Sequence, residues 1–129
     1  PGQIMIYVLI NIRRMGISVR NLIYILEDAV ISLMKKFDVE ASRKKGAPGV
    51  YVKGEKIASI GLRITRGSSY HGLSLNYDVD LKPFSDIDIC GYQDLKATSL
   101  KSLKISVNKK IVADTLVELI NEKITTFQT

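Results

Sequence analysis

The sequence of 129 residues contains one cysteine, one histidine and no tryptophan. A single cysteine cannot close a disulfide within the chain, which favours a reducing compartment, so we expect a cytoplasmic protein. One histidine with one cysteine cannot complete a metal site, and we expect no metal. The chain also lacks a secretory signal, a Walker-type phosphate loop and any apolar run near the roughly 18 residues of a membrane span. These absences argue against membrane proteins and nucleoside-triphosphate enzymes.

Composition and charge point to a folded protein with an acidic partner. Hydrophobic residues make up 46% of the chain and charged residues 25%, and the length suits one domain over residues 1–129. The net charge of +6 favours nucleic acid, an anionic membrane or an acidic protein as partner. The densest positive group, Arg43 to Lys45, is typical of a solvated surface. No basic stripe with interleaved aromatic residues supports nucleic-acid binding.

The apolar periodicity predicts two helices. After the possible cap Ser18, apolar side chains recur at spacings of three and four from Val19 to Phe37, which predicts about five helical turns. Asn108 is the expected cap of a second helix. The apolar side of that helix comprises Val112, Leu116, Leu119 and Ile120.

The predicted strands span residues 3–12, 50–52, 56–65 and 70–79. The first is dense in aliphatic residues and indicates a buried strand, whereas the last two alternate around a glycine-containing turn and indicate a hairpin. Residues 42–48 are expected to form a basic loop, 81–98 to be irregular, and 100–107 to form either a short strand or a loop. The order predicts an α/β (α+β) fold, a mixed β-sheet sandwich flanked by helices.

Cys90 lies in the polar run DIDICGYQ, and two hypotheses for it stay open. A free cysteine is most often buried and inert, whereas a reactive thiol needs a base or a positive charge beside it. The sequence offers Lys56 and His71, although a lone histidine is more often a hydrogen-bonded structural group. Lys56 has the strand parity of Ala58 and Ile60, so we expect it on the core side. There it is either a stem that reaches solvent or a partly desolvated ammonium that holds a thiolate.

The predicted hairpin has one face of small and polar residues. Gly61 and Gly72 interrupt the strand patterns, where glycine weakens packing unless the backbone must approach something closely. With Ser59, Ser74 and Asn76 they form a face that either lines a narrow slot for an extended ligand or reflects two β-bulges.

Beyond these local features, the sequence resembles a known family. The segments PGVYVKGEKIASIGLRITRG, HGLSLN, DLKPF and CGY, in this order and spacing, closely resemble the octanoyl-acyl carrier protein:protein octanoyltransferases, also called lipoyl(octanoyl) transferases. The opening PGQ and the segment SVRNLIYILEDAV fit the same pattern. The resemblance covers essentially the whole chain and is strongest over residues 48–100. The combination is specific, although no single segment is.

The resemblance implies a thioester mechanism. Enzymes of this kind move an octanoyl chain from acyl carrier protein, through a cysteine thioester, to the ε-amino group of a lysine in a lipoyl domain. Cys90 matches the nucleophile and Lys56 the lysine that activates it, while Ile89 stands where the family usually has proline. His71 is expected near the site without a catalytic role. The segments that match the acyl-binding site comprise Ser59, Ile60, Gly61, Gly72, Leu73 and Ser74.

The resemblance also implies partners and a truncated fold. The expected partners are octanoyl-acyl carrier protein and the lipoyl domains of 2-oxoacid dehydrogenases and of the glycine cleavage H protein, with no cofactor, no nucleic acid and no membrane. Family members carry a further N-terminal stretch with the motif RGGQxTYHG, which runs into PGQ. We therefore expect the biotin/lipoate protein ligase–octanoyltransferase fold, truncated at the N-terminus.

Two rival hypotheses stay open. An ATP-dependent lipoate–protein ligase shares this fold but does not use a cysteine nucleophile. A truncated, non-catalytic remnant would only dock acyl carrier protein or a lipoyl domain. An octanoyl adduct on Cys90 after mixing with the acyl donor would separate the enzyme from the docking module.

Overall fold

The computed structural model describes residues 2–9, 16–65, 68–79 and 96–128 of the chain. For residues 9, 62–65, 68–71 and 128 it describes the backbone alone. Cys90 and the side chain of His71 therefore lie outside the described part, as do the last residues of the first predicted strand.

Both predicted helices are present and both predicted caps are confirmed. Helix α2 (Val19–Lys36) begins at Ser18, whose Oγ accepts a hydrogen bond of 3.1 Å from the backbone amide three residues on. Helix α4 (Lys109–Gln128) begins at Asn108, whose Oδ1 accepts one of 2.8 Å from the amide two residues on. No helix within the described ranges is long and apolar enough to cross a membrane.

Among the residues that the structure describes, five strands form one sheet in the order β1-β5-β4-β3-β2. These are β1 (Gln3–Leu9), β2 (Ser42–Lys44), β3 (Ala47–Val52), β4 (Glu55–Thr65) and β5 (Ser68–Asn76). All four pairings are antiparallel: hairpins connect β2 through β5, and β1 pairs with β5 from a distant part of the chain. An isolated bridge between Lys56 and Ala97 is parallel. The α+β architecture and the predicted β4–β5 hairpin are confirmed. Residues 100–107 form turns and irregular chain, not a strand.

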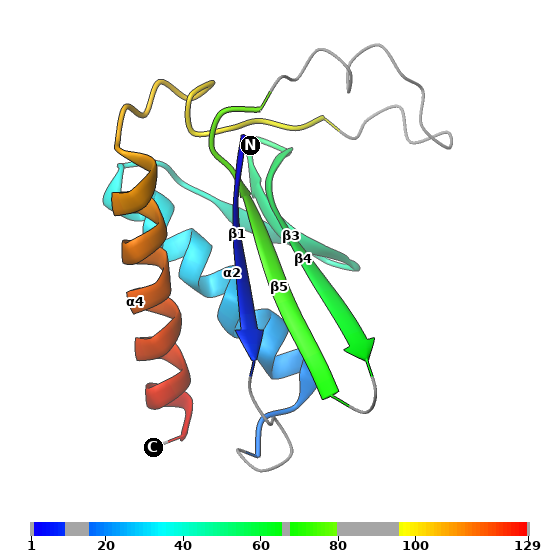
Figure 1. Cartoon of the computed structure of the whole chain (residues 1–129). Coiled ribbons are helices and arrows are strands. Elements are labelled where there is room, and N and C mark those ends of the chain that lie inside the picture. The colour runs from blue at the N-terminus through cyan, green and yellow to red at the C-terminus, as the bar shows by residue number, and fades with distance from the viewer. Residues whose placement is uncertain (1, 10–15, 66–67, 80–95, 129) are drawn as a thin grey trace.

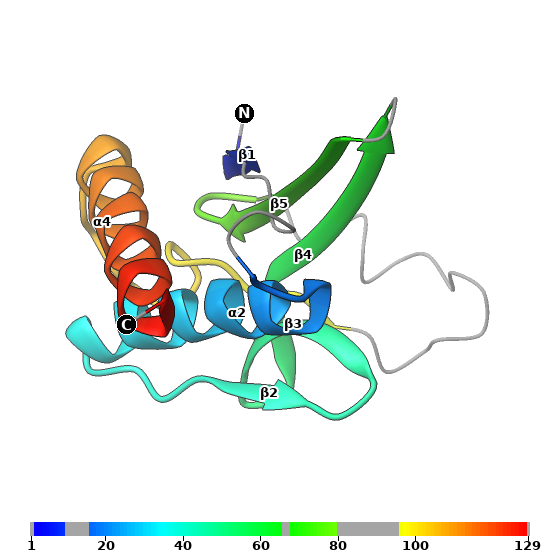
Figure 2. The same cartoon turned by 90° about the horizontal axis from the view of Figure 1, so that it is seen from below.

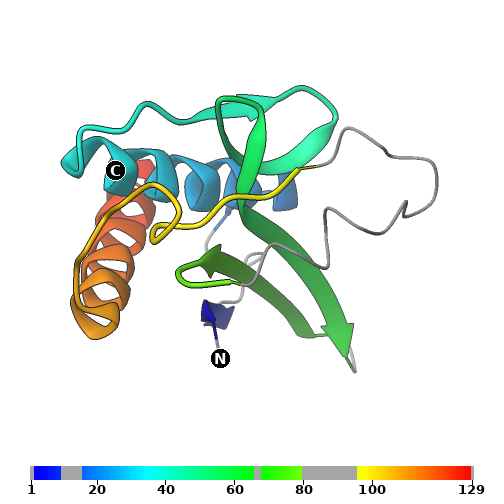
Figure 3. The same ribbon diagram turned by 90° about the horizontal axis from the view of Figure 1, so that it is seen from above.

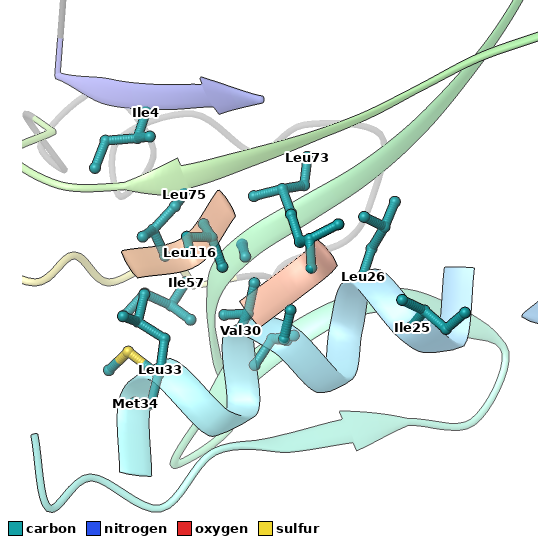
Figure 4. Packing of buried hydrophobic residues seen from close by; sticks show 14 of the residues in the cluster. Ile4, Ile25, Leu26, Val30, Leu33, Met34, Ile57, Leu73, Leu75 and Leu116 are labelled. Atoms are coloured by element: carbon teal, nitrogen blue, oxygen red, sulfur yellow. The ribbon is translucent and has the colours of Figure 1, made fainter. Parts of the chain in front are cut away.

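The sheet curls around α2, so that β1, β5 and β4 lie on one side of the helix and β2 on the other (Figures 2 and 3). Helix α4 lies beside α2 (Figure 1) and makes further contacts with β1. The core fills the space between the helices and the inner face of the sheet (Figure 4). Its fully or nearly fully buried members include Leu26, Val30, Leu33, Met34, Ile57, Leu73, Leu75 and Leu116.

Strand β1 is buried on one side only. Ile4 and Val8 belong to the core, whereas Met5 and Tyr7 are 51% and 60% exposed. The prediction of a buried strand is therefore wrong for the outer side of β1, because the two described helices cover the other face of this antiparallel sheet.

A register shift between β3 and β4 changes the face on which Lys56 lies. Val50 pairs with Ala58 and Tyr51 pairs with Lys56, so Ile57 has no partner and forms a β-bulge. Neighbouring residues of β3 point to opposite faces, and paired residues share a face. Val50 and Ala58 lie in the core, so Lys56 lies on the opposite face with Tyr51. The core-side prediction for Lys56 is wrong because period-two counting does not see the bulge.

The basic segment also differs from its prediction. Residues 42–48 form most of the β2–β3 hairpin rather than a loop. Arg43 is not simply solvated: it pairs with Glu27 at 3.1 Å and with Asp28 at 3.4 Å, and its guanidinium lies 3.8 Å from the centroid of the Tyr24 ring. Lys123 of α4 pairs with Asp28 at 2.8 Å. These ion pairs tie β2 and α4 to α2.

We expect acid to weaken the fold through Asp28. Burial raises the pKa of Asp28, but hydrogen bonds and charges from Lys123 and Arg43 outweigh it and hold the pKa below its usual range. The stabilisation is complete above the unfolded-state pKa of ~3.9 and is lost as the pH falls from there through the lower folded-state pKa. Because the side chain is 37% exposed, Asp28→Asn should cost about 1 kcal/mol or less at pH 7.

Urea unfolding of the parent and of Asp28→Asn at neutral pH and below pH 4 measures this difference. Asp114→Asn is the matched control, because Asp114 forms only an exposed pair with Lys110 on α4. Equal acid dependence in the two variants would contradict the role given to Asp28.

Candidate active site

Two rows of residues cross the open face of the sheet, opposite the helices. Met5 of β1 pairs with Ser74 of β5, and Ser74 pairs with Ser59 of β4. One step along the strands, the second row comprises Tyr7, Gly72 and Gly61. The small polar face predicted for the hairpin is therefore confirmed, and β1 adds two large side chains to it.

Met5 and Tyr7 are the residues of this face that sequence reasoning missed. The Tyr7 ring covers Gly72, since a Cβ at Gly72 would lie 3.2 Å from its nearest ring atom. No atom of the described residues lies within 4 Å of a Cβ built at Gly61, so these residues leave the face open there. An alternation of polar and apolar residues along β1 would have been the signal, but residues 4–9 are apolar or aromatic throughout.

The site residues expected from the resemblance divide between the two faces. Ser59, Gly61, Gly72 and Ser74 lie on the open face, whereas Leu73 is buried in the core and Ile60 packs against it. Ser74 Oγ is a buried side-chain oxygen for which the described part of the chain provides no hydrogen-bond partner. A buried hydroxyl in this state retains its capacity to bind a polar group of a ligand.

The backbone of Lys56 is fixed by the chain that follows residue 95. The Lys56 amide donates to the Lys96 carbonyl oxygen at 2.8 Å, and the Thr98 amide donates to the Lys56 carbonyl oxygen at 2.9 Å. Asn76 Nδ2 donates to the Thr98 carbonyl oxygen at 3.0 Å and, at 3.4 Å, to that of Lys56. The segment that contains Cys90 therefore rejoins the described structure directly beside Lys56.

The side chain of Lys56 lies against β3. A Cβ at Gly49 would lie 2.8 Å from Lys56 Cε and 3.5 Å from Lys56 Nζ. The ammonium is 6.0 Å from the centroid of the Tyr51 ring, and Lys44 Nζ is 4.6 Å from the same centroid. Tyr51 is buried, and this burial, followed by the charge of Glu27, raises its pKa above the usual value.

Comparison with known proteins identifies the class to which this fold belongs. The biotin protein ligase from Aquifex aeolicus superposes with a TM-score of 0.77 at 18% identity, over 98% of this chain and 55% of that one. A lipoate-protein ligase A bound with ATP gives 0.70 at 10% identity, over 95% and 51% of the two chains. The fold is thus that of the biotin and lipoate protein ligases.

Sequence relatives narrow the assignment. Residues 1–124 match the lipoyl protein ligase A/B catalytic domain. The octanoyltransferase of Psychromonas ingrahamii is 45% identical over 96% of this chain and 57% of its own length, and that of Aromatoleum aromaticum is 51% identical over 82% and 46%. The chain belongs to the lipoyl protein ligase A/B catalytic domain family. It spans about half the length of these curated relatives.

We expect Gly49→Ala to strain this site. Gly49 has φ of +141°, and its new Cβ would meet the Ala58 carbonyl oxygen as well as Lys56 Cε at 2.8 Å. Overpacking of this kind costs about 1–3 kcal/mol in addition to the backbone penalty. Gly46→Ala is the control, since Gly46 also has positive φ but has open space around its Cβ position. Urea unfolding should show the larger loss for Gly49→Ala; equal losses would contradict the steric argument.

Proposed function

We propose that the complete protein transfers an octanoyl group from acyl carrier protein, through a thioester on Cys90, to the ε-amino group of a lysine in lipoyl domains. One observation carries the proposal: Lys56 lies on the open face of small residues and is hydrogen-bonded to the chain that returns from Cys90. Octanoyltransferases that are 45% to 51% identical support it.

The chemistry needs a thiolate, an acyl donor and an amine. The Cys90 thiolate attacks the donor thioester carbonyl and forms a new carbon–sulfur bond, while the bond to the carrier's sulfur breaks; that sulfur takes a proton from the Lys56 ammonium and leaves as a thiol. The acceptor amine then attacks the acyl-enzyme, the Cys90 thiolate leaves, and the amine loses a proton. Because the donor is already an activated thioester, these steps consume no ATP. The Lys56 ammonium favours the thiolate by its charge, and its amine form accepts a proton.

The chain length permits the encounter of Cys90 with Lys56. Cys90 precedes Lys96 by six residues, a stretch that spans at most about 20 Å when fully extended, and Lys96 is bonded to Lys56. This length allows Cys90 to approach Lys56 without any change in the described strands.

The open face suits an extended acyl chain. Gly61 offers close approach to the backbone, while Met5 and Tyr7 supply apolar surface. Burying about seven methylene groups at ~0.8 kcal/mol each would contribute roughly 5 kcal/mol before entropic costs. Ser74 Oγ is available for a polar end group of the ligand.

The partners follow from this reaction. The donor is octanoyl-acyl carrier protein, and the acceptors are lipoyl domains of 2-oxoacid dehydrogenases and the glycine cleavage H protein. Carriers and acceptors of this kind are typically acidic, and the net charge of +6 provides electrostatic attraction to them. We place the protein in the cytoplasm, where its single cysteine stays reduced.

Cys90→Ser should abolish the acyl-enzyme and leave the fold intact, because serine is close in volume but its hydroxyl ionises far less readily than a thiol. Intact mass after mixing the complete protein with octanoyl-acyl carrier protein should show one octanoyl adduct in the parent and none in the variant. Octanoyl transfer by the serine variant at the parent's rate would refute the nucleophile assignment.

Lys56→Met should make Cys90 less reactive at neutral pH. Loss of the ammonium should move the midpoint of the pH dependence of alkylation upward by about one unit, or ~1.4 kcal/mol of thiolate stabilisation. Lys45→Met, in the exposed turn between β2 and β3, is the control that changes net charge equally. If Lys56→Met leaves the pH profile of Cys90 alkylation unchanged, the proposed pairing of Lys56 with Cys90 is wrong.

A further inference from the structure

Glu27 is a buried carboxylate that the proposed reaction does not use. It lies on α2, its side chain is only 9% exposed, and both of its oxygens are engaged. Oε1 accepts a hydrogen bond from Arg43 Nε at 3.1 Å. Oε2 accepts one from the Gly49 backbone amide at 2.9 Å. Desolvation of a carboxylate is costly unless such partners compensate it, so the orientation of Glu27 is strongly determined.

The bond to Gly49 fixes β3 at the point where it supports Lys56. Gly49 has φ of +141°, a conformation that side-chain-bearing residues rarely adopt. A Cβ at Gly49 would come within 2.8 Å of both Lys56 Cε and the Ala58 carbonyl oxygen. The missing side chain therefore leaves a space that the stem of Lys56 occupies.

We propose that Glu27 is a positioning residue for Lys56 and acts through Gly49. The carboxylate holds the Gly49 amide, the held backbone defines the space beside β4, and that space sets the path of the Lys56 stem. The inference rests on the proposed role of Lys56, since only then does this path affect the reaction. The claim that Glu27 sets the position of the Lys56 side chain through Gly49 does not depend on that role.

A purely structural role for Glu27 predicts a different pattern. If Glu27 served only to pair with Arg43 and join α2 to β2, then the effect of each substitution would depend mainly on whether it keeps the negative charge. Glu27→Asp, which keeps the charge, would be milder than Glu27→Gln. If Glu27 positions Lys56, reach matters most, because the amide oxygen of glutamine still reaches the Gly49 amide whereas the shorter aspartate carboxylate does not.

The experiment follows the Lys56 side chain directly. Reductive ¹³C-methylation of the lysines of the complete protein gives an NMR signal for Lys56, which the loss of one signal in Lys56→Arg assigns. We expect Glu27→Asp and Glu27→Ala to shift this signal and Glu27→Gln to keep it closer to the parent position. Arg43→Gln, the matched control, should lower the melting temperature and leave the Lys56 signal in place, because the Glu27–Gly49 bond remains.

Kinetics of the unmethylated variants provide the second readout. Glu27→Asp should lower the single-turnover rate of octanoyl transfer to Cys90 about tenfold, with the half-saturating donor concentration nearly unchanged, because displacement of a reacting group weakens the transition state more than binding. Glu27→Gln should recover most of that rate. If Glu27→Ala does not fold, the comparison of Glu27→Asp with Glu27→Gln still tests whether Glu27 positions Lys56.

Three outcomes would overturn the inference: an unmoved Lys56 signal in Glu27→Asp, a signal that Arg43→Gln shifts equally, or a glutamine variant more impaired than the aspartate variant. Failure of the proposed function looks different. Octanoyl transfer by Cys90→Ser would refute the thioester route while the Lys56 signals of all Glu27 variants behaved as expected.

Discussion

The unpartnered residue Ile57 decides which groups meet on each face of the sheet. It places two consecutive residues of β4, Ile57 and Ala58, in the core, and the side chain before them turns to the other side. Without the bulge, an ammonium would face the apolar surface of α2, where burial of an unpaired charge is expensive. With it, Lys56 joins Ser59 and Gly61 on the open face. The β-bulge at Ile57 thus places the Lys56 ammonium on the open face of the sheet.

Local patterns predicted what depends on neighbouring residues in the chain. The helix caps Ser18 and Asn108 and the β4–β5 hairpin follow from short-range hydrogen bonds and alternation, and each is confirmed. The face of Lys56 was predicted wrongly, because the alternation was counted from Ala58 to Ile64 and extended through Ile57, where the β-bulge interrupts it. The ion pairs of Arg43 were also missed, since their partners lie on α2 and become neighbours only after folding.

The strong curl of the sheet brings a partner to the buried carboxylate of Glu27. The β2–β3 hairpin wraps to the far side of α2 (Figure 2) and brings Arg43 against the helix. There Glu27 accepts from one side chain and one backbone amide, which satisfies a carboxylate that water cannot easily reach. Removing only one partner of such a pair is more damaging than never having had it. The basic β2–β3 hairpin therefore stabilises a buried carboxylate as well as contributing to the net positive charge.

The parallel bridge between Lys56 and Ala97 has a consequence for the order of assembly. The turn between β4 and β5 closes over a few residues, whereas this bridge closes over about forty, and the added loop-closure entropy is roughly 2 kcal/mol. Asn76 and Thr98 offset part of that entropy with hydrogen bonds that form only after the closure. The open face of the hairpin can form from local contacts. The lysine at its end acquires fixed surroundings only once distant parts of the chain have met.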